Sequence, residues 1–281
     1  MSSSQSPADD QIVSRPVGCQ TYTWQMLGHA WDGDLDAVLD AVAAAGYDGI
    51  EVTNRTIGRY ADHASAFAAA LASRGLRFPA YACSTESGWT DPRLLERDLE
   101  SVDGWCRFLG SFPGTLLALG GAAVTLPDDE DGAFVRACRL YNQAGAAALR
   151  HGVAAVIHPS SHHGSILRTA DDYHRLLDAL DPAVVNFGPD AGHMYRGGMD
   201  VVSELRRVLP RCRQVHLKDV HEDGRWAPFG RGAVDLRGIL RLLDDASFAG
   251  WITLEEEADE ARADPAAAVT AARQVLGNLL R

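Results

Sequence analysis

The chain has 281 residues, 46% of them hydrophobic, and a mean hydropathy of -0.13. This length and composition suit a soluble globular protein that can bury a large core. Its 38 acidic and 26 basic residues give a formal net charge of -12, which would repel a phosphate backbone and argues against nucleic acid as the main partner.

The first residues, MSSSQSPADDQ, are polar, and we expect residues 1–14 to form a disordered tail ahead of one domain at residues 15–281. This segment lacks the apolar centre of a signal peptide, and no later run reaches the length of a membrane span. Five scattered cysteines without a C-x-x-C pair suit reduced thiols. The sequence therefore predicts a cytoplasmic protein that does not act at a membrane.

Short apolar or β-branched runs alternate along the chain with segments of helical periodicity, and turn residues lie between them. The predicted strands are 17–24, 47–53, 76–82, 115–121, 153–158, 183–190, 213–219 and 250–257. The predicted helices are Leu35–Ala45, Ala61–Ser73, Pro92–Leu109, Gly132–Arg150, Asp171–Leu180, Val201–Val208, Leu236–Leu243 and Pro265–Leu280. Eight strand–helix units predict an α/β protein with a single-domain (β/α)8 barrel. An open doubly wound sheet is disfavoured, because no glycine-rich dinucleotide turn follows the first strand.

Alternation along each strand predicts which side chains point into the barrel. In WITLEEE, Ile252 and Leu254 suit packing against helices, which leaves Glu255 and Glu257 pointing inward, while Glu256 is expected to be solvated. The same alternation points four more side chains inward: Glu51, His158, His216 and Lys218.

Active sites of such barrels lie where the strands end. The sixth strand ends at Asp190, and His193 follows in the glycine-rich loop of NFGPDAGHMYRGG. We expect four strand ends to direct His158, Asp190, His216 and Glu255 toward one point. Two imidazoles and two carboxylates suit a divalent ion, with Mn²⁺ or Co²⁺ favoured and Fe²⁺, Mg²⁺ or Zn²⁺ as alternatives. Such an ion, or a substrate, must offset the cost of burying these charges.

Further residues near the barrel mouth have both a structural and a functional interpretation. Lys218 either pairs with Asp219 or Glu257 or takes part in catalysis. The others either belong to the core or to surface loops, or contact the substrate. They are His162, His163, Arg231, Tyr81 and Trp24.

Five stretches carry a family resemblance: IHPSSHHGSILRTADDYHRLLDALDP, VNFGPDAGHMYRGGMD, VHLKDV, FGRGAVDLRGIL and GWITLEEEAD. After its tail the chain resembles the xylose isomerase-like TIM barrels, or sugar phosphate isomerases/epimerases, and its second half is most similar to the inosose (2-keto-myo-inositol) dehydratases. The resemblance implies a TIM barrel with metal-dependent sugar chemistry, often a dimer or tetramer. It also implies that Asp190, His216 and Glu255 bind the metal and that His193 and Lys218 lie near the substrate.

The fifth strand distinguishes groups within this family. Ketose 3-epimerases and hydroxypyruvate isomerase carry a glutamate there, which works with the eighth-strand glutamate as an acid/base pair. This chain has His158, as the inosose dehydratases do. Its HPSSHHG is two residues longer than the H-P-H-x-G usual in that group, so either His162 or His163 takes the place of the second histidine.

The chemistry shared by the family is proton removal beside a carbonyl, with a metal stabilising the enediolate. A reversible epimerase needs bases on both faces of the carbon, whereas elimination needs one base and one acid. We therefore predict a metal-dependent carbon–oxygen lyase for an inosose or 3-keto-glycoside type of keto-polyol or keto-sugar, with a ketose epimerase or aldose–ketose isomerase as the alternative. The candidate bases are Glu257, Glu51, His193 and Lys218. The candidate acids are His193 and a histidine of the strand-five loop.

Overall fold

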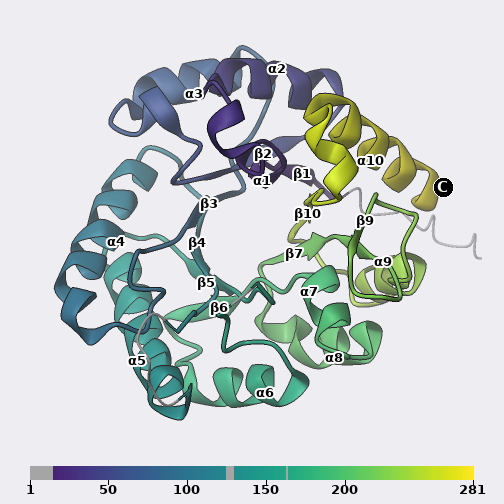
Figure 1. Ribbon diagram of the computed structural model, residues 1–281. Coiled ribbons are helices and arrows are strands. Elements are labelled where there is room, and N and C mark those ends of the chain that lie inside the picture. Colours follow the sequence, from purple (N-terminus) through teal and green to yellow (C-terminus); the bar gives the residue numbers. More distant parts are fainter. Residues whose placement is uncertain (1–14, 125–129, 163) are drawn as a thin grey trace, which may run out of the picture.

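The computed structural model describes residues 15–124, 130–162 and 164–281, and it shows a ring of strands inside a ring of helices (Figure 1). The predicted tail at residues 1–14 and His163 lie outside the described residues. The strands of the inner ring are β1 (Val17–Gln20), β2 (Gly49–Thr53), β3 (Ala80–Cys83), β4 (Leu116–Gly120), β5 (Ala155–His158), β6 (Val185–Phe187), β7 (Gln214–Leu217) and β10 (Trp251–Leu254).

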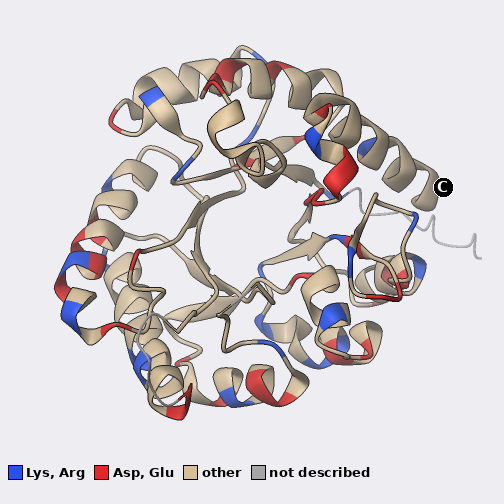
Figure 2. Cartoon of the chain, in the orientation of Figure 1, with Lys and Arg blue, Asp and Glu red and all other residues tan. Residues whose placement is uncertain are grey.

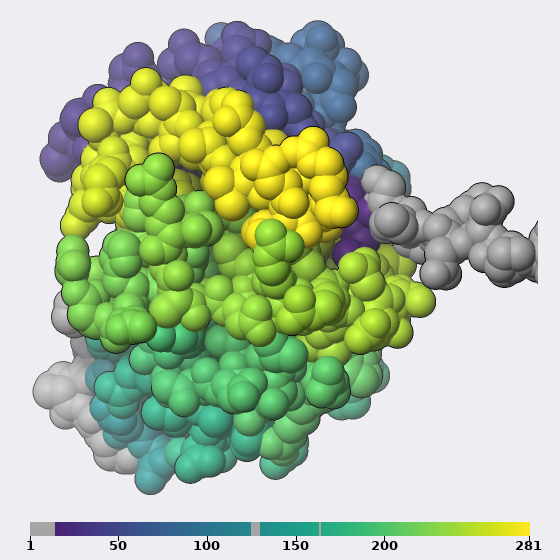
Figure 3. All heavy atoms as spheres, turned by 90° about the vertical axis from the view of Figure 1, so that its right-hand side faces the viewer, coloured from purple at the N-terminus to yellow at the C-terminus, as the bar shows by residue number. Residues whose placement is uncertain are grey.

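The eight strands form one parallel sheet in the order β6-β5-β4-β3-β2-β1-β10-β7. Two isolated parallel bridges, Phe187 with Cys212 and Asp190 with His216, connect the two ends of that order. The sheet is therefore a nearly closed barrel, and the predicted TIM barrel fold is confirmed. Figure 3 shows the start of the described chain next to the C-terminal part, where Arg15 Nε donates to the Phe248 carbonyl at 3.0 Å.

All eight predicted helices are present in the outer ring. They are α2 (Leu35–Ala44), α3 (Ala64–Ala72), α4 (Leu95–Leu109), α5 (Glu130–Arg150), α6 (Ala170–Ala179), α8 (Val201–Val208), α9 (Leu236–Asp245) and α10 (Pro265–Leu279). Asp34, Asp235 and Asp264 begin three of them by accepting backbone N–H groups of the first turn, which satisfies donors that have no partner within a helix. Among the described residues, no helix is long and apolar enough to cross a membrane.

Two short α-helices and two short strands on the described connections after the barrel strands were not predicted. They are α1 (Tyr22–Gln25), α7 (Ala191–Arg196), β8 (Asp219–Val220) and β9 (Trp226–Ala227). The prediction of a strand through Trp24 and of a loop at His193 was therefore wrong, as was the extension of the sixth strand to Asp190. Helices of one or two turns are too short to show a hydrophobic period.

The core separates the sheet from the helices, and charged residues mostly lie on the outer helices (Figure 2). Inside the barrel the packing depends on small side chains. Ala80, Leu116, Ala118 and Val156 form a separate buried cluster against Ala82, because alternate residues of β3, β4 and β5 point inward.

Two helical glycines differ in their surroundings. A Cβ added to Gly145 in α5 would lie 2.4 Å from Val185 Cγ2 and 2.6 Å from the Val184 carbonyl oxygen. A Cβ added to Gly104 in α4 would meet Arg107 at 3.7 Å. Close packing therefore requires glycine at residue 145 and not at residue 104.

We predict opposite effects of alanine at these two positions. Gly145→Ala forces α5 away from the chain leading into β6 and should lower the free energy of unfolding by about 1–3 kcal/mol. Gly104→Ala should raise it by up to about 1 kcal/mol, because alanine favours the helix. Urea unfolding followed by circular dichroism measures both changes, and equal changes would contradict the packing described.

Candidate functional site

The structure brings together the four side chains predicted as metal ligands. His158 ends β5, His216 lies in β7, Glu255 follows β10 and Asp190 caps the start of α7. One ligand atom from each lies within 4.8 Å of every other. Asp190, His216 and Glu255 are buried, and His158 is partly buried. Below, these four residues are called the four-residue cluster.

Hydrogen bonds turn one ring nitrogen of each histidine toward the cluster. His158 Nδ1 lies 3.2 Å from the Gly188 carbonyl oxygen, which can only accept, so Nε2 is left without a proton and faces Glu255 at 3.9 Å. His216 Nε2 lies 3.1 Å from Glu51 Oε2, while its Nδ1 lies 3.0 Å from Glu255 Oε2. His158 Nε2 can therefore offer a lone pair to an ion directly, and His216 Nδ1 can do so once an ion displaces the proton that it shares with Glu255.

Asp190 supplies a carboxylate oxygen without a hydrogen-bond partner. Its Oδ1 accepts the His193 N–H at 2.9 Å, but its buried Oδ2 accepts no hydrogen bond. Lys218 Nζ lies 3.6 Å from that oxygen. An unsatisfied buried oxygen is costly, and a divalent ion would satisfy it. Two imidazoles and two carboxylates without a thiolate form a donor set that fits such an ion.

Glu51 lies behind His216. It is 1% exposed, and Oε2 accepts from Gln214 Nε2 and from His216 Nε2. Burial by itself lowers the pKa of His216, but Glu51 and Glu255 raise it to about 10. A carboxylate in this position orients a ligand histidine. The structure therefore does not support Glu51 as a base that contacts the substrate.

A second group of His162, His193 and Glu257 lies beside the four-residue cluster, with ligand atoms within 4.8 Å of one another. Lys218 Nζ lies 3.0 Å from Glu257 Oε1, 3.2 Å from His193 Nε2 and 3.1 Å from Glu255 Oε1. The ammonium group therefore already supplies a cation here, so this group suits substrate contact better than a second metal ion.

Burial shifts the pKa values of this second group. It raises the pKa of Glu257 to about 8, although Lys218 opposes the shift, and Glu255 adds to it. Burial, together with Lys218, lowers the pKa of His162 to about 4. A carboxyl group that titrates near neutral pH is suited to acid/base catalysis.

Two aromatic residues that the sequence did not single out complete this region. Tyr22 lies 5.9 Å from His162, measured between ring centroids. Trp226 lies 4.9 Å from His193, and Lys218 Nζ lies 4.7 Å from the Trp226 ring. Trp226 is brought to the site by the β8–β9 hairpin, which has no clear sequence pattern. In CQTYTW the sequence predicted a substrate contact at Trp24 and not at Tyr22, which lies two residues earlier.

The predicted substrate contacts Tyr81, Trp24 and Arg231 form no hydrogen bond, ion pair or ring contact with the four-residue cluster among the described residues. Tyr81 packs against Phe78 and Phe108 at 6.0 and 5.6 Å, because its neighbours in β3 take the inward positions. Trp24 is a buried member of the main core. Arg231 is exposed in the loop before α9.

One further expectation about an acidic residue was wrong. Glu256 is buried, not solvated, because its carboxylate accepts the Phe229 and Ala258 N–H groups at 2.9 Å each. Of the two partners expected for Lys218, the structure bears out Glu257. Asp219 instead accepts backbone N–H groups of the loop before α9, including that of Gly232 at 2.8 Å.

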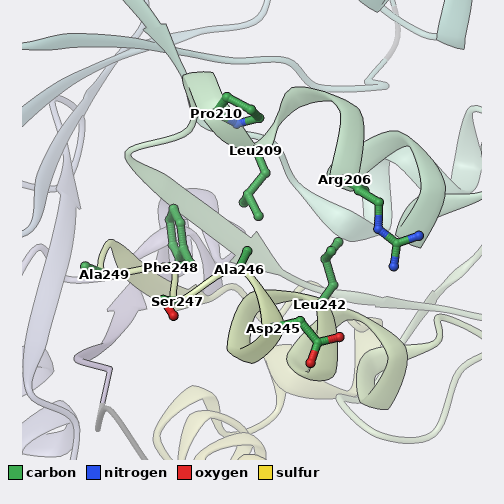
Figure 4. A pocket seen from close by; sticks show the side chains of 9 residues that line it. All are labelled: Arg206, Leu209, Pro210, Leu242, Asp245, Ala246, Ser247, Phe248 and Ala249. Carbon is green, nitrogen blue, oxygen red and sulfur yellow. The ribbon is translucent and has the colours of Figure 1, made fainter.

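A surface hollow of about 560 Å³ lies between the ends of α8 and α9 (Figure 4). Leu209, Leu242 and Phe248 line it together with Arg206 and Asp245. These residues precede β7 and β10 in the chain, so the hollow lies at the end of the barrel opposite the four-residue cluster.

Comparisons with known proteins agree with this architecture. The model of the family described as xylose isomerase-like TIM barrel matches residues 39–279, so the chain belongs to that family. An inosose dehydratase from Clostridium tetani is 29% identical, and the match covers 44% of this chain and 47% of that protein. An inosose dehydratase from Bacillus velezensis is 24% identical over 94% of this chain and 98% of its own length. The family resemblance is thus confirmed, and these names also bear out the expectation of an enzyme.

Two solved structures show the same fold. The structure of IOLI protein with a binding zinc atom has a TM-score of 0.78 at 15% identity and covers 94% of this chain and 98% of that one. D-psicose 3-epimerase from Clostridium cellulolyticum H10 has a TM-score of 0.74 at 17% identity, with 93% and 99% covered.

Replacing Glu51 tests its role behind His216. We expect Glu51→Gln to weaken Mn²⁺ binding by about 10- to 100-fold, the usual effect of losing a carboxylate that orients a ligand histidine. The matched control is Glu222→Gln, because Glu222 is exposed on the β8–β9 hairpin. Calorimetric titration of the demetallated proteins measures both affinities, and an unchanged affinity in Glu51→Gln would rule out the orienting role.

Proposed function

We propose that the chain is a divalent-metal-dependent dehydratase that acts on a keto-polyol or keto-sugar of the inosose or 3-keto-glycoside type. The observation that carries this proposal is the four-residue cluster with its unpartnered Asp190 oxygen, directly beside the Lys218–Glu257 pair. The similarity to inosose dehydratases supports the reaction class.

The residues of the four-residue cluster would hold the ion. When bound, the ion would supply Lewis-acid stabilisation of the negative charge that develops on the substrate's carbonyl oxygen. Mn²⁺ or Co²⁺ suits the mixed nitrogen and oxygen donors, and the zinc atom of the IOLI protein structure supports a divalent ion.

Glu257 is the residue best placed to remove the proton beside the carbonyl. Glu51 is occupied with His216, and Lys218 is held as an ammonium by Asp190, Glu255 and Glu257. The C–H proton passes to the Glu257 carboxylate, a C=C bond forms, and the C–O bond at the next carbon breaks. Lys218 gives a proton to the departing hydroxyl, which leaves as water, and recovers one from Glu257 across 3.0 Å.

An epimerase is the second candidate. His162 Nε2 lies 3.7 Å from Glu257 Oε1, and its lowered pKa keeps it neutral near pH 7. A neutral imidazole and a carboxylate could serve as two bases. Elimination is favoured because β5 ends in His158 instead of a second acid/base carboxylate.

The remaining expectations stay predictions. The substrate is a small, unphosphorylated sugar or polyol, the assembly is a dimer or tetramer, and the protein acts in the cytoplasm.

The proposed reaction is tested by proton NMR. Demetallated protein, reloaded with Mn²⁺, is incubated with 2-keto-myo-inositol or a 3-keto-glycoside in deuterated water, and His216→Ala is treated identically. We expect deuterium uptake and an alkene or diketone product from the wild type and neither from the variant. Epimerised product without elimination would establish the second candidate, and no reaction of any keto-polyol would contradict both.

The role of Glu257 predicts a pH effect. The side chain is a base only when ionised, so the activity of the wild type should rise with pH through about 8. Glu257→Gln should lower kcat by at least about 100-fold and leave Mn²⁺ bound. A pH–rate profile measures this, with the exposed residue changed in Glu260→Gln as the control. Near-normal kcat in Glu257→Gln would exclude it as the base.

A further inference from the structure

The loop after β5 contacts His193 through Ser161, which lies in the lengthened HPSSHHG segment. The Ser161 backbone N–H donates to His193 Nδ1 at 2.9 Å, and the Ser161 hydroxyl lies 2.8 Å from the same nitrogen. His193 is 1% exposed. Both groups of Ser161 therefore meet one buried ring nitrogen that water does not reach freely.

This contact fixes the position of the ring proton. A backbone N–H can only donate, so His193 Nδ1 must present its lone pair and carries no proton. A neutral imidazole then holds its proton on Nε2. A doubly protonated ring would place the Nδ1 proton against the Ser161 N–H, so the contact also disfavours the imidazolium.

The Nε2 side of His193 faces another donor. Lys218 Nζ lies 3.2 Å away, and an ammonium group has no lone pair to offer. The edge-to-face rings of His162 at 5.0 Å and Trp226 at 4.9 Å restrict the ring on either side. The His193 Nε2–H and the Lys218 ammonium cannot accept from each other, but both can donate a hydrogen bond to one acceptor placed between them.

We propose that Ser161 is a positioning residue that holds His193 as its Nε2–H tautomer, so that His193 and Lys218 form a two-donor site for one oxygen of the substrate. The assignment of that oxygen to a keto-polyol rests on the proposed function. Paired donors aimed at one oxygen stabilise charge that develops there during the reaction.

The assignment changes the roles considered for His193. With Nδ1 occupied by Ser161 and Nε2 protonated, the ring has no free lone pair for taking a proton from carbon. It also cannot bind a second metal ion with His162 and Glu257. His193 is therefore a neutral hydrogen-bond donor, in place of the base or acid that the sequence suggested.

The tautomer can be measured without substrate or turnover. Long-range ¹H–¹⁵N correlation spectra of protein labelled with ¹⁵N-histidine report the protonation of each ring nitrogen, and comparison with His193→Gln assigns the resonances. We expect the shift of an unprotonated nitrogen for Nδ1 and of a protonated one for Nε2. A protonated Nδ1 would overturn the proposal. If the protein proved not to be a dehydratase, the expected protonation of His193 would be the same, so the two failures can be told apart.

Variants of the loop test the role of Ser161. Ser161→Ala keeps the N–H but loses the hydroxyl and should lower kcat roughly three- to tenfold, the effect of one hydrogen bond, with KM little changed. Ser161→Thr should restore kcat, and the neighbouring Ser160→Ala is the matched control. Ser161→Pro removes the N–H donor as well and should yield protein with protonated Nδ1. Unprotonated Nδ1 and normal kcat in Ser161→Pro, or equal kcat in Ser161→Ala and Ser160→Ala, would contradict the role.

Discussion

The arrangement of the site depends on the burial of negative charge inside the barrel. Glu51, Asp190 and Glu255 are each at most 5% exposed. Burial by itself would raise the pKa of Glu255, yet Lys218 and His216 hold it well below its usual range. Carboxylates kept ionised away from water need cations close by. The Lys218 ammonium meets part of that need, and a divalent ion at the four-residue cluster would meet the rest.

The two halves of the site differ in how they neutralise this buried negative charge. Hydrogen bonds from His158 to Gly188 and from His216 to Glu51 leave His158 Nε2 and His216 Nδ1 facing the same carboxylate, that of Glu255. On the other side, Lys218 brings donors rather than lone pairs. One half therefore suits a metal ion and the other suits the oxygens and the acidic C–H of a substrate.

The sequence predicted the barrel because each strand–helix unit repeats the same pattern, and the alternation of Ile252, Leu254 and Glu255 gives the facing of a strand directly. It also predicted which four side chains meet, since parallel strands of a barrel end at the same face. It could not predict α7 or the β8–β9 hairpin, whose lengths carry no period. The contact of Ser161 with His193 depends on α7, and the position of Trp226 depends on the hairpin. The burial of Glu256 depends on backbone N–H groups that no residue pattern reveals.

The most direct test of the account is the position of the metal. Anomalous diffraction from crystals of the Mn²⁺-loaded protein would locate the ion independently of any activity. We expect one peak in contact with His158 Nε2, Asp190 Oδ2, His216 Nδ1 and the Glu255 carboxylate. A peak at His162, His193 and Glu257 instead, or none at the four-residue cluster under saturating Mn²⁺, would contradict it.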